Sequence, residues 1–150
     1  MSELTIRQAE LHDVGAVFKL AQQLAVFEEL TDSFVADIED YRRWLFGEHP
    51  AATVLLAEAD GEIAGMALYV TTFSTFLGLP GIWLEDLYVS EGYRRLGVAS
   101  LLLEELERRS PGRVEWEVLG WNDGAVALYE AQGARPVTGW VKYRMSPAAD

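Results

Sequence analysis

The chain has 150 residues, 50% of them hydrophobic, which is enough for one folded domain with a buried core. It has no cysteine, which excludes disulfides, thiolate metal sites and a cysteine nucleophile, and with only His12 and His49 no metal centre is expected. The net charge of −12 argues against nucleic acid and anionic membranes as partners and would steer a cationic amine inward, although the same acidity could serve solubility alone.

Hydrophobic periodicity predicts elements in the order β-α-α-β-β-β-α-β-α-β, an α/β protein with a mixed sheet and helices packed on it. In chain order they are a strand at 4–7, a helix from Asp13 to about 28, a helix at 34–46, strands at 53–59, 62–73 and 82–89, a helix at 97–109, a strand at 113–119, a helix at 122–132 and a final β segment at 137–145. Asp13 is expected to cap the first helix, Asp60-Gly61 to form a hairpin turn between antiparallel strands, and Gly78-Leu79-Pro80-Gly81 to break the chain.

No long apolar run predicts a membrane-spanning helix, and the N-terminus lacks the basic-then-apolar order of a signal peptide. A cytoplasmic protein is therefore expected. Trp83, Trp116, Trp121 and Trp140 are interpreted as packing residues of the core or of an interface.

The connection between the strand at 82–89 and the following helix has the composition of a phosphate site. Helix N-termini carry unpaired N–H groups, and the small residues Gly97 and Ala99 would let a pyrophosphate approach them. Arg94 and Arg95 add donors and positive charge. The spacing matches neither the dinucleotide fingerprint nor the P-loop, and by itself it also fits an ordinary strand-to-helix connection.

Two motifs in order resemble those of one enzyme superfamily. The turn Arg94-Arg95-Leu96-Gly97-Val98-Ala99 resembles the (Gln/Arg)-x-x-Gly-x-(Gly/Ala) motif of the GNAT acetyltransferases, preceded by the central-strand sequence Leu84-Glu85-Asp86-Leu87-Tyr88-Val89. Downstream, Trp121-Asn122-Asp123 and 127–134 resemble the second cofactor motif of that superfamily. The resemblance spans nearly the whole chain. It implies a single GNAT domain over 1–150, with a mostly antiparallel sheet splayed at the central strand.

Shorter matches, such as Leu84-Glu85-Asp86 and Phe46-Gly47-Glu48-His49-Pro50, resemble the spermidine/spermine N-acetyltransferase group, whose relatives include enzymes for thialysine and other small amines. The resemblance implies acetyl-CoA as co-substrate, a small basic amine as acceptor, direct transfer in a ternary complex, and a homodimer. We expect the final β segment around 140–145 to form part of the dimer contact. A protein or peptide N-acetyltransferase and a non-catalytic acyl-CoA sensor remain alternatives.

Carried over position by position, the resemblance implies Tyr129 as the acid that protonates the thiolate and Glu85 as the base, acting through water. It implies cofactor contacts at Leu87, Tyr88, Val89, Arg94, Arg95, Leu96, Gly97, Val98, Ala99, Ser100, Asn122, Ala125 and Tyr129. A helix N-cap is a second reading of Asn122.

The amine is expected at Phe27, Glu28, Glu85 and Asp86, although Phe27 stands where the polyamine enzymes have a tyrosine. Strand alternation places Glu85 and Asp86 on opposite faces, so that one of them faces the cleft. Glu28, Glu29 and Asp32 form an acidic cluster that could bind a cation or could be a solvated helix end.

Overall fold

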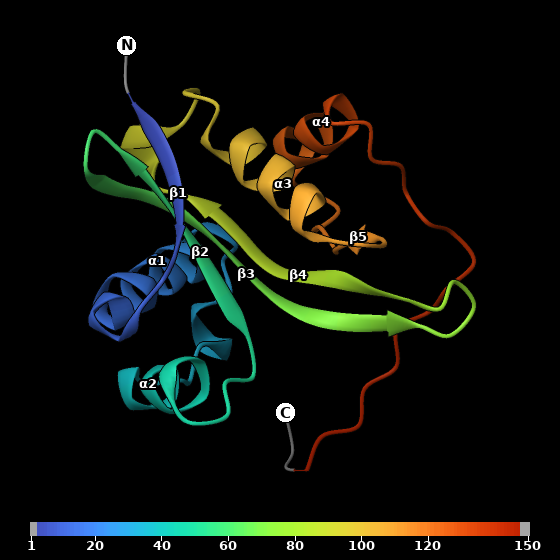
Figure 1. Ribbon diagram of the computed structural model, residues 1–150, viewed down its shortest axis with the longest axis horizontal. Coiled ribbons are helices and arrows are strands. Elements are labelled where there is room, and N and C mark those ends of the chain that lie inside the picture. The colour runs from blue at the N-terminus through green and yellow to red at the C-terminus, as the bar shows by residue number, and fades with distance from the viewer. Residues whose placement is uncertain (1–2, 148–150) are drawn as a thin grey trace. The chain divides into compact units, whose positions relative to one another are not determined.

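The computed structural model describes residues 3–147, and the chain divides into two compact units, Met1–Leu119 and Gly120–Asp150. The first unit holds a five-stranded sheet in the order β1-β2-β3-β4-β5 (Figure 1). Its strands are β1 (Leu4–Gln8), β2 (Thr53–Ala59), β3 (Glu62–Ser74), β4 (Leu79–Val89) and β5 (Val114–Glu115). Its helices are α1 (Val14–Phe27), α2 (Ile38–Phe46) and α3 (Val98–Arg109), with short 3-10 turns at Leu11–Asp13, Thr31–Ser33 and Glu91–Tyr93.

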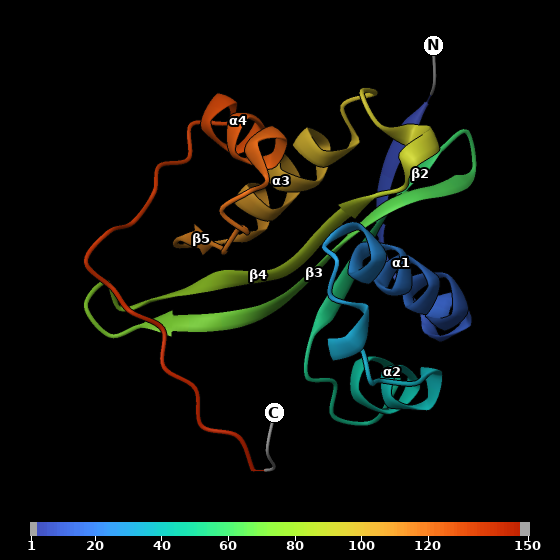
Figure 2. The same ribbon diagram turned by 180° about the vertical axis from the view of Figure 1, so that it is seen from behind.

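Strands β1 to β4 are antiparallel to their neighbours, and β5 runs parallel to β4. Asp60 and Gly61 both have positive φ, 52° and 83°, which gives the twist that a two-residue hairpin needs and confirms the expected turn. The β3–β4 pairing continues to Ser74 and Leu79, whereas β2 pairs with β3 only up to Tyr69. The distal parts of β3 and β4 therefore run on side by side beyond β2 (Figure 2).

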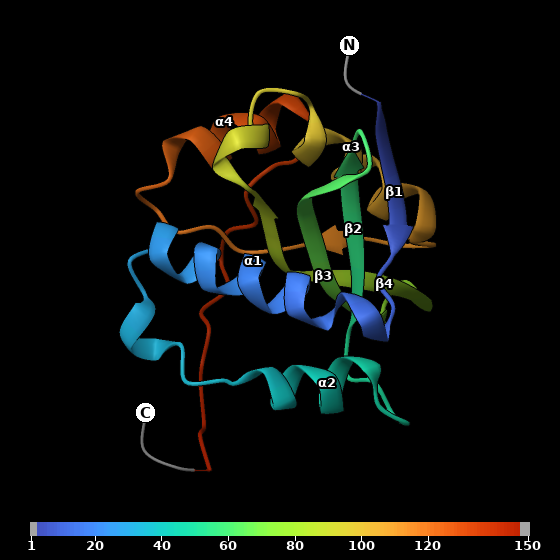
Figure 3. The same cartoon turned by 90° about the vertical axis from the view of Figure 1, so that its left-hand side faces the viewer.

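Helices cover both faces of this sheet, with α1 and α2 on one face and α3 on the other (Figure 3). On the first face, Val17 and Leu20 of α1 pack with Leu56, Met66 and Tyr88 of the sheet. Leu102 and Leu106 of α3 are fully buried as well. The mixed α/β fold class is thus confirmed.

Three element boundaries in the first unit differ from expectation. The break before β4 lies at 75–78, so Pro80 falls inside the strand, opposite Phe73. A proline is tolerated there because β5 pairs only with Ile82 and Trp83, which leaves that side of β4 as an edge at Pro80. Helix α2 begins at Ile38, where Asp37 accepts a hydrogen bond from Asp40 N, and the strand expected over 113–119 shrinks to β5.

The second unit contains helix α4 (Asp123–Ala131). Asn122 caps it by accepting a hydrogen bond from Ala125 N at 3.2 Å, and Gly133, with φ of 89°, follows its end. The final β segment predicted over 137–145 is wrong, because no strand occurs in the described residues of this unit. Its composition is β-like, but a strand also needs a neighbouring strand to pair with, and Trp140 is 83% exposed.

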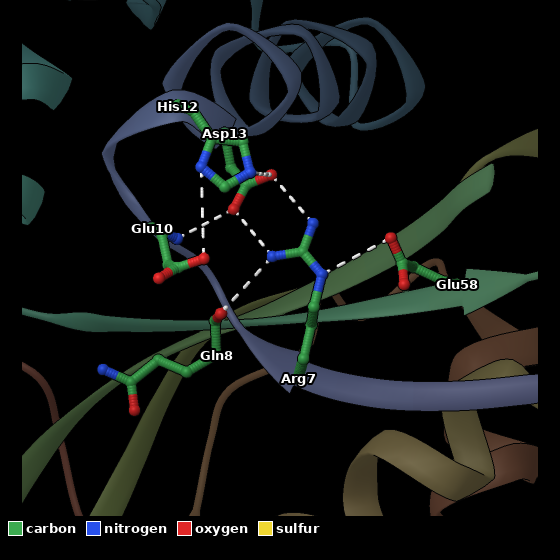
Figure 4. A network of polar contacts seen from close by, with 6 residues as sticks. All are labelled: Arg7, Gln8, Glu10, His12, Asp13 and Glu58. Carbon is green, nitrogen blue, oxygen red and sulfur yellow. Dashed lines mark hydrogen bonds and ion pairs between the residues drawn. The ribbon is translucent and has the colours of Figure 1, made fainter. Parts of the chain in front are cut away.

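A partly buried ion pair anchors the start of α1 to the sheet edge (Figure 4). Asp13, 4% exposed, accepts two hydrogen bonds of 2.8 Å from the Arg7 guanidinium and one from the Glu10 N–H. Arg7 also pairs with Glu58 of β2 at 3.4 Å. Asp13 therefore makes no side-chain hydrogen bond to α1, contrary to the expected cap, and instead joins β1 to the turn before the helix.

These contacts make acid stability a direct test of the Arg7–Asp13 pair. The Arg7 hydrogen bonds lower the pKa of Asp13 from its ordinary 3.8 to about 2, so this stabilisation is complete above pH 3.8 and is lost as the pH falls through 2. Asp13→Asn should lower the free energy of unfolding at pH 7 by about 2 kcal/mol, and the deficit should shrink toward pH 2. Urea unfolding measures the loss of stability at pH 7 and its change with pH. Glu107→Gln, on the exposed surface of α3, is the control. Equal stability of Asp13→Asn and the parent at pH 7 would contradict the role of the pair.

Candidate functional site

The turn between β4 and α3 has an unusual backbone. Arg95 and Gly97 both have positive φ, 66° and 84°, on either side of Leu96. Gly97 occupies the N-cap position without a side chain, so the first N–H groups of α3, at Val98, Ala99 and Ser100, have no side-chain cap from it. Such a turn at a helix N-terminus is a concave set of donors suited to a phosphate. Adding a side chain at Gly97 would strain this φ.

Arg94 does not point into open solvent from this turn. Its guanidinium carbon lies 4.9 Å from the ring centre of Phe27 and 5.6 Å from that of Tyr88. Its Nε donates to Val89 O at 3.1 Å, and Nη2 lies 3.5 Å from the Tyr88 hydroxyl. Arg94 makes no ion pair within residues 3–147, so its charge is not neutralised by a carboxylate there.

Strand β4 contains a β-bulge at Glu85. Leu84 is opposite Tyr69 and Asp86 is opposite Leu68, so Glu85 has no partner on β3. Glu85 is exposed, and its carboxylate accepts a hydrogen bond of 3.2 Å from the Trp83 indole N–H. Trp83, expected only to pack, thus also orients this carboxylate.

The sheet also opens at this point. Among the described residues, β5 pairs with β4 only at Ile82 and Trp83. The stretch from Leu87 to Val89 therefore has β3 on one side and no strand on the other, in keeping with the expected splay at the central strand.

A cavity of about 340 Å³ lies on the α1 side of β4. Two carboxylates, Glu28 and Asp86, face it together with the Tyr41 phenol of α2. Its other lining residues are mostly apolar: Ala21, Leu24, Ala25, Leu30, Ser33, Phe34, Val35 and Ala36. Glu29 and Asp32, the other members of the predicted acidic cluster, are exposed and do not line it.

Burial and mutual repulsion shift the acidity of these groups. Burial, followed by the charges of Glu85 and Glu28, raises the pKa of Asp86 to about 6. Burial also raises the pKa of Glu28, and burial with the nearby Asp86 charge raises the pKa of Tyr41 to about 12. Neither Glu28 nor Asp86 has a cationic partner in the described part of the chain. The cavity is therefore a negative site that a cation would stabilise.

The first unit thus brings Glu28 and Asp86 together at one cavity and joins Phe27, Tyr88 and Arg94 in a second cluster. Tyr41 was missed as a site residue, because its spacing with Ile38, Trp44 and Leu45 is typical of the apolar face of a helix. Its hydroxyl was the available signal, since a buried phenol needs a polar neighbour. The second unit contains Asn122, Ala125 and Tyr129 on or beside α4, and the Asn122 side chain accepts a hydrogen bond from Ala125 N. Their proposed roles stay predictions.

Comparison with known proteins shows the family. The model of the acetyltransferase (GNAT) family matches residues 23–134, so the chain belongs to that family and is an acetyltransferase. Thialysine N-epsilon-acetyltransferase of Sus scrofa is 34% identical over 99% of this chain and 96% of its own length. L-ornithine N5-acetyltransferase NATA1 of Arabidopsis thaliana is 30% identical over 94% and 83%, respectively.

The same fold occurs in a solved aminoglycoside N-acetyltransferase, AAC(6')-Iy, in complex with CoA. It superposes with a TM-score of 0.72, is 20% identical, and the match covers 97% of this chain and 96% of the other. The resemblance inferred from the two motifs is therefore confirmed. Within residues 3–147 no helix is long and apolar enough to cross a membrane, and no cluster of three potential metal ligands occurs.

The raised pKa of Asp86 predicts that its charge destabilises the fold. An acid with a raised pKa favours folding below its ordinary pKa of 3.8 and loses that contribution as the pH rises through about 6. Asp86→Asn should therefore raise the free energy of unfolding at pH 7.5 by about 2 kcal/mol, with the gain vanishing below pH 4. Urea unfolding at several pH values measures this, and exposed Asp32→Asn serves as control. A variant less stable than the parent at pH 7.5 would refute the burial argument.

Proposed function

We propose that this acetyltransferase moves the acetyl group of acetyl-CoA to a primary amine of a small basic molecule. The observation that carries the proposal is the apolar cavity with Glu28 and Asp86 as its two carboxylates and no cation of the described chain beside them. An alkylammonium group supplies that missing charge, and its carbon chain fits the apolar wall.

The turn before α3 supports acetyl-CoA as the donor. GNAT enzymes use this co-substrate, and the N–H groups at Val98, Ala99 and Ser100, with Arg94 nearby, suit a pyrophosphate. The unpaired side of β4 from Leu87 to Val89 offers backbone groups to an extended amide-containing arm, as an added strand would. In this proposal Asn122 and Ala125 contact the same arm.

Acetyl transfer requires the amine to lose protons and the thiolate to gain one. Bound acetyl-CoA supplies an acyl carbon that the neutral amine attacks as the carbon–sulfur bond breaks. Glu85, exposed at the bulge and held by Trp83, is positioned to take the proton of the ammonium, directly or through water. In this scheme Asp86 and Glu28 bind the cation. Tyr129 donates a proton to the departing sulfur and regains one from the nitrogen as the amide forms, so the net proton remains on Glu85. In this scheme transfer is direct, as the resemblance to the family implies, and the chain has no cysteine that could carry the acetyl group.

Among small amines, those with a terminal amino group on a short flexible chain suit the cavity volume of about 340 Å³. The relatives named for thialysine and ornithine support an amino acid with a side-chain amine, and the resemblance to the polyamine group supports a diamine or polyamine. A peptide substrate would need an open groove, and a sensor would need neither Glu85 nor Tyr129.

The first experiment is release of free thiol from acetyl-CoA with thialysine, ornithine, lysine, putrescine, spermidine, spermine and a basic peptide. Turnover with one small-amine class is expected, and Asp86→Asn should raise the KM for that amine more than the KM for acetyl-CoA. Turnover with the peptide alone would favour the peptide reading. Tight CoA binding with no turnover on any acceptor would favour the sensor.

The proposed roles of Tyr129 as acid and Glu85 as base predict different losses of activity when each residue is replaced. Tyr129→Phe should lower kcat about 100-fold, since general acid catalysis contributes on that scale, while the Kd for CoA changes little. Glu85→Gln should lose most rate at low pH, where little free amine is present. Steady-state kinetics across pH measures both effects. A Tyr129→Phe enzyme with parental kcat would exclude Tyr129 as the acid. A Glu85→Gln enzyme with the parental pH profile would exclude Glu85 as the base.

We further propose a single domain over 1–150 that acts as a homodimer in the cytoplasm, where acetyl-CoA is available. Support for the dimer comes from exposed apolar side chains around Trp140, which are typical of an interface. Sedimentation velocity tests this assembly, and the mass of one chain alone would refute it.

A further inference from the structure

Phe27 was expected to line the amine site, yet it does not face the acidic cavity. Glu28, the next residue, lines that cavity, whereas Phe27 is absent from its wall and is 39% exposed. Phe27 is the last residue of α1, and its ring lies 6.5 Å from that of Tyr88, with the planes tilted by 58°. The contacts of Phe27 therefore indicate a role other than lining the amine cavity.

The two rings hold one cation. The Arg94 guanidinium lies over Phe27 at 4.9 Å and over Tyr88 at 5.6 Å, and its Nε is tied to Val89 O. We call Phe27 and Tyr88 the aromatic bracket. Arg94 directly follows the 3-10 turn at Glu91–Tyr93, and its long side chain would sample many rotamers if nothing held it. The bracket restricts those rotamers without neutralising the charge, because a ring face attracts a cation but is not an anion.

Four other arginines of the described chain differ from Arg94, whereas Arg43 likewise lies over a ring, that of Trp44, at 4.8 Å. Arg7, Arg42, Arg108 and Arg109 are each paired with a carboxylate. In an acidic protein, an arginine next to a proposed phosphate site that is held by rings keeps its full charge for an anionic ligand. Arg94 also lies only a few residues before the donor turn at Gly97.

We propose, building on the proposed acetyl-CoA site, that Phe27 is a positioning residue for the cofactor: it holds Arg94 where the guanidinium binds a phosphate oxygen of CoA. Phe27 thereby acts on the cofactor from the helix that also supplies the amine cavity. Tyr88 forms the second half of the bracket and is anchored in the core, so it is the less suitable side chain to replace.

The test is the Kd for CoA, measured by calorimetry without any amine. Phe27→Leu keeps a large apolar side chain but removes the ring, and should weaken CoA binding about three- to tenfold, the scale of one cation–π contact. Phe27→Tyr keeps the ring face and should bind CoA like the parent. Val26→Ala, at the neighbouring exposed position of the same helix end, is the matched control and should also bind like the parent.

A double-mutant cycle with Arg94→Gln separates positioning from a general effect on the fold. In the Arg94→Gln background, Phe27→Leu should no longer change the Kd, because the group it positions is absent. An equal loss in both backgrounds, or parental affinity in Phe27→Leu, would overturn the bracket while leaving acetyl transfer intact. Failure of the parent itself to bind CoA would overturn the proposed function together with the bracket. Thermal unfolding of each variant shows whether it is folded.

The proposal also predicts how the kinetic constants divide. Phe27→Leu should raise the KM for acetyl-CoA by the same three- to tenfold and leave the KM for the amine near the parental value. A reversed pattern, with the amine KM raised alone, would return Phe27 to the amine site and overturn the inference.

Discussion

The one-residue bulge at Glu85 determines which side chains meet at the site. Directly opposed residues of an antiparallel pair share a face, so Leu84 shares the face of Tyr69, and Asp86 shares the face of Leu68. Leu68 and Tyr69 are consecutive and point to opposite faces, which means that Leu84 and Asp86 do so too. In an unbroken strand these two residues would lie on one face. The extra residue therefore moves Asp86 to the α1 face and leaves Glu85 exposed between them.

Two further arrangements depend on this change of face. Tyr88 follows Asp86 by two residues and lies opposite Met66, so it packs into the α1-side core, where its ring reaches Arg94. Asp86 reaches the cavity beside Glu28, where burial and repulsion between the carboxylates raise its pKa. A carboxylate held in this way costs stability, and sites that bind a substrate commonly carry such a cost. The bulge thus places the acidic cavity beside the strand that also leads into the proposed phosphate-binding turn.

Much of the fold could be predicted from local signals, because hairpin turns and helix caps depend on residues that are close together in the sequence. Asp60-Gly61 predicted its turn, and Asn122 its cap, since each depends on backbone conformations that few residue types favour. The bulge at Glu85 could not be predicted, because its register is set by the opposing strand and not by β4 itself. The β segment over 137–145 failed for a related reason: composition reports the propensity to form a strand, whereas pairing needs a second strand.

In the candidate site, too, some features could be predicted from local sequence and others depend on tertiary contacts. Motif spacing identified the turn at Arg94 to Ala99, whose proposed function depends on its own backbone. It could not show that Glu28 alone among three neighbouring acids faces the cavity, because Glu29 has a φ of 58° and turns the chain at the end of α1. Nor could it show that Phe27 contacts Arg94, since these residues lie far apart in sequence.

The separation of charges within the site explains why both aromatic rings lie where they do. Arg94 is near two residues that adjoin the cavity carboxylates, since Phe27 precedes Glu28 and Tyr88 follows Asp86 on the same strand face. An arginine free to enter the cavity would pair with those carboxylates, and both the cation and the anions would be neutralised. Within the described residues no such pair forms. In the proposed function, the rings hold the guanidinium on their faces and so keep a positive charge available for a phosphate and a negative cavity available for an amine. The proposed transfer between an anionic donor and a cationic acceptor would use both charges at once.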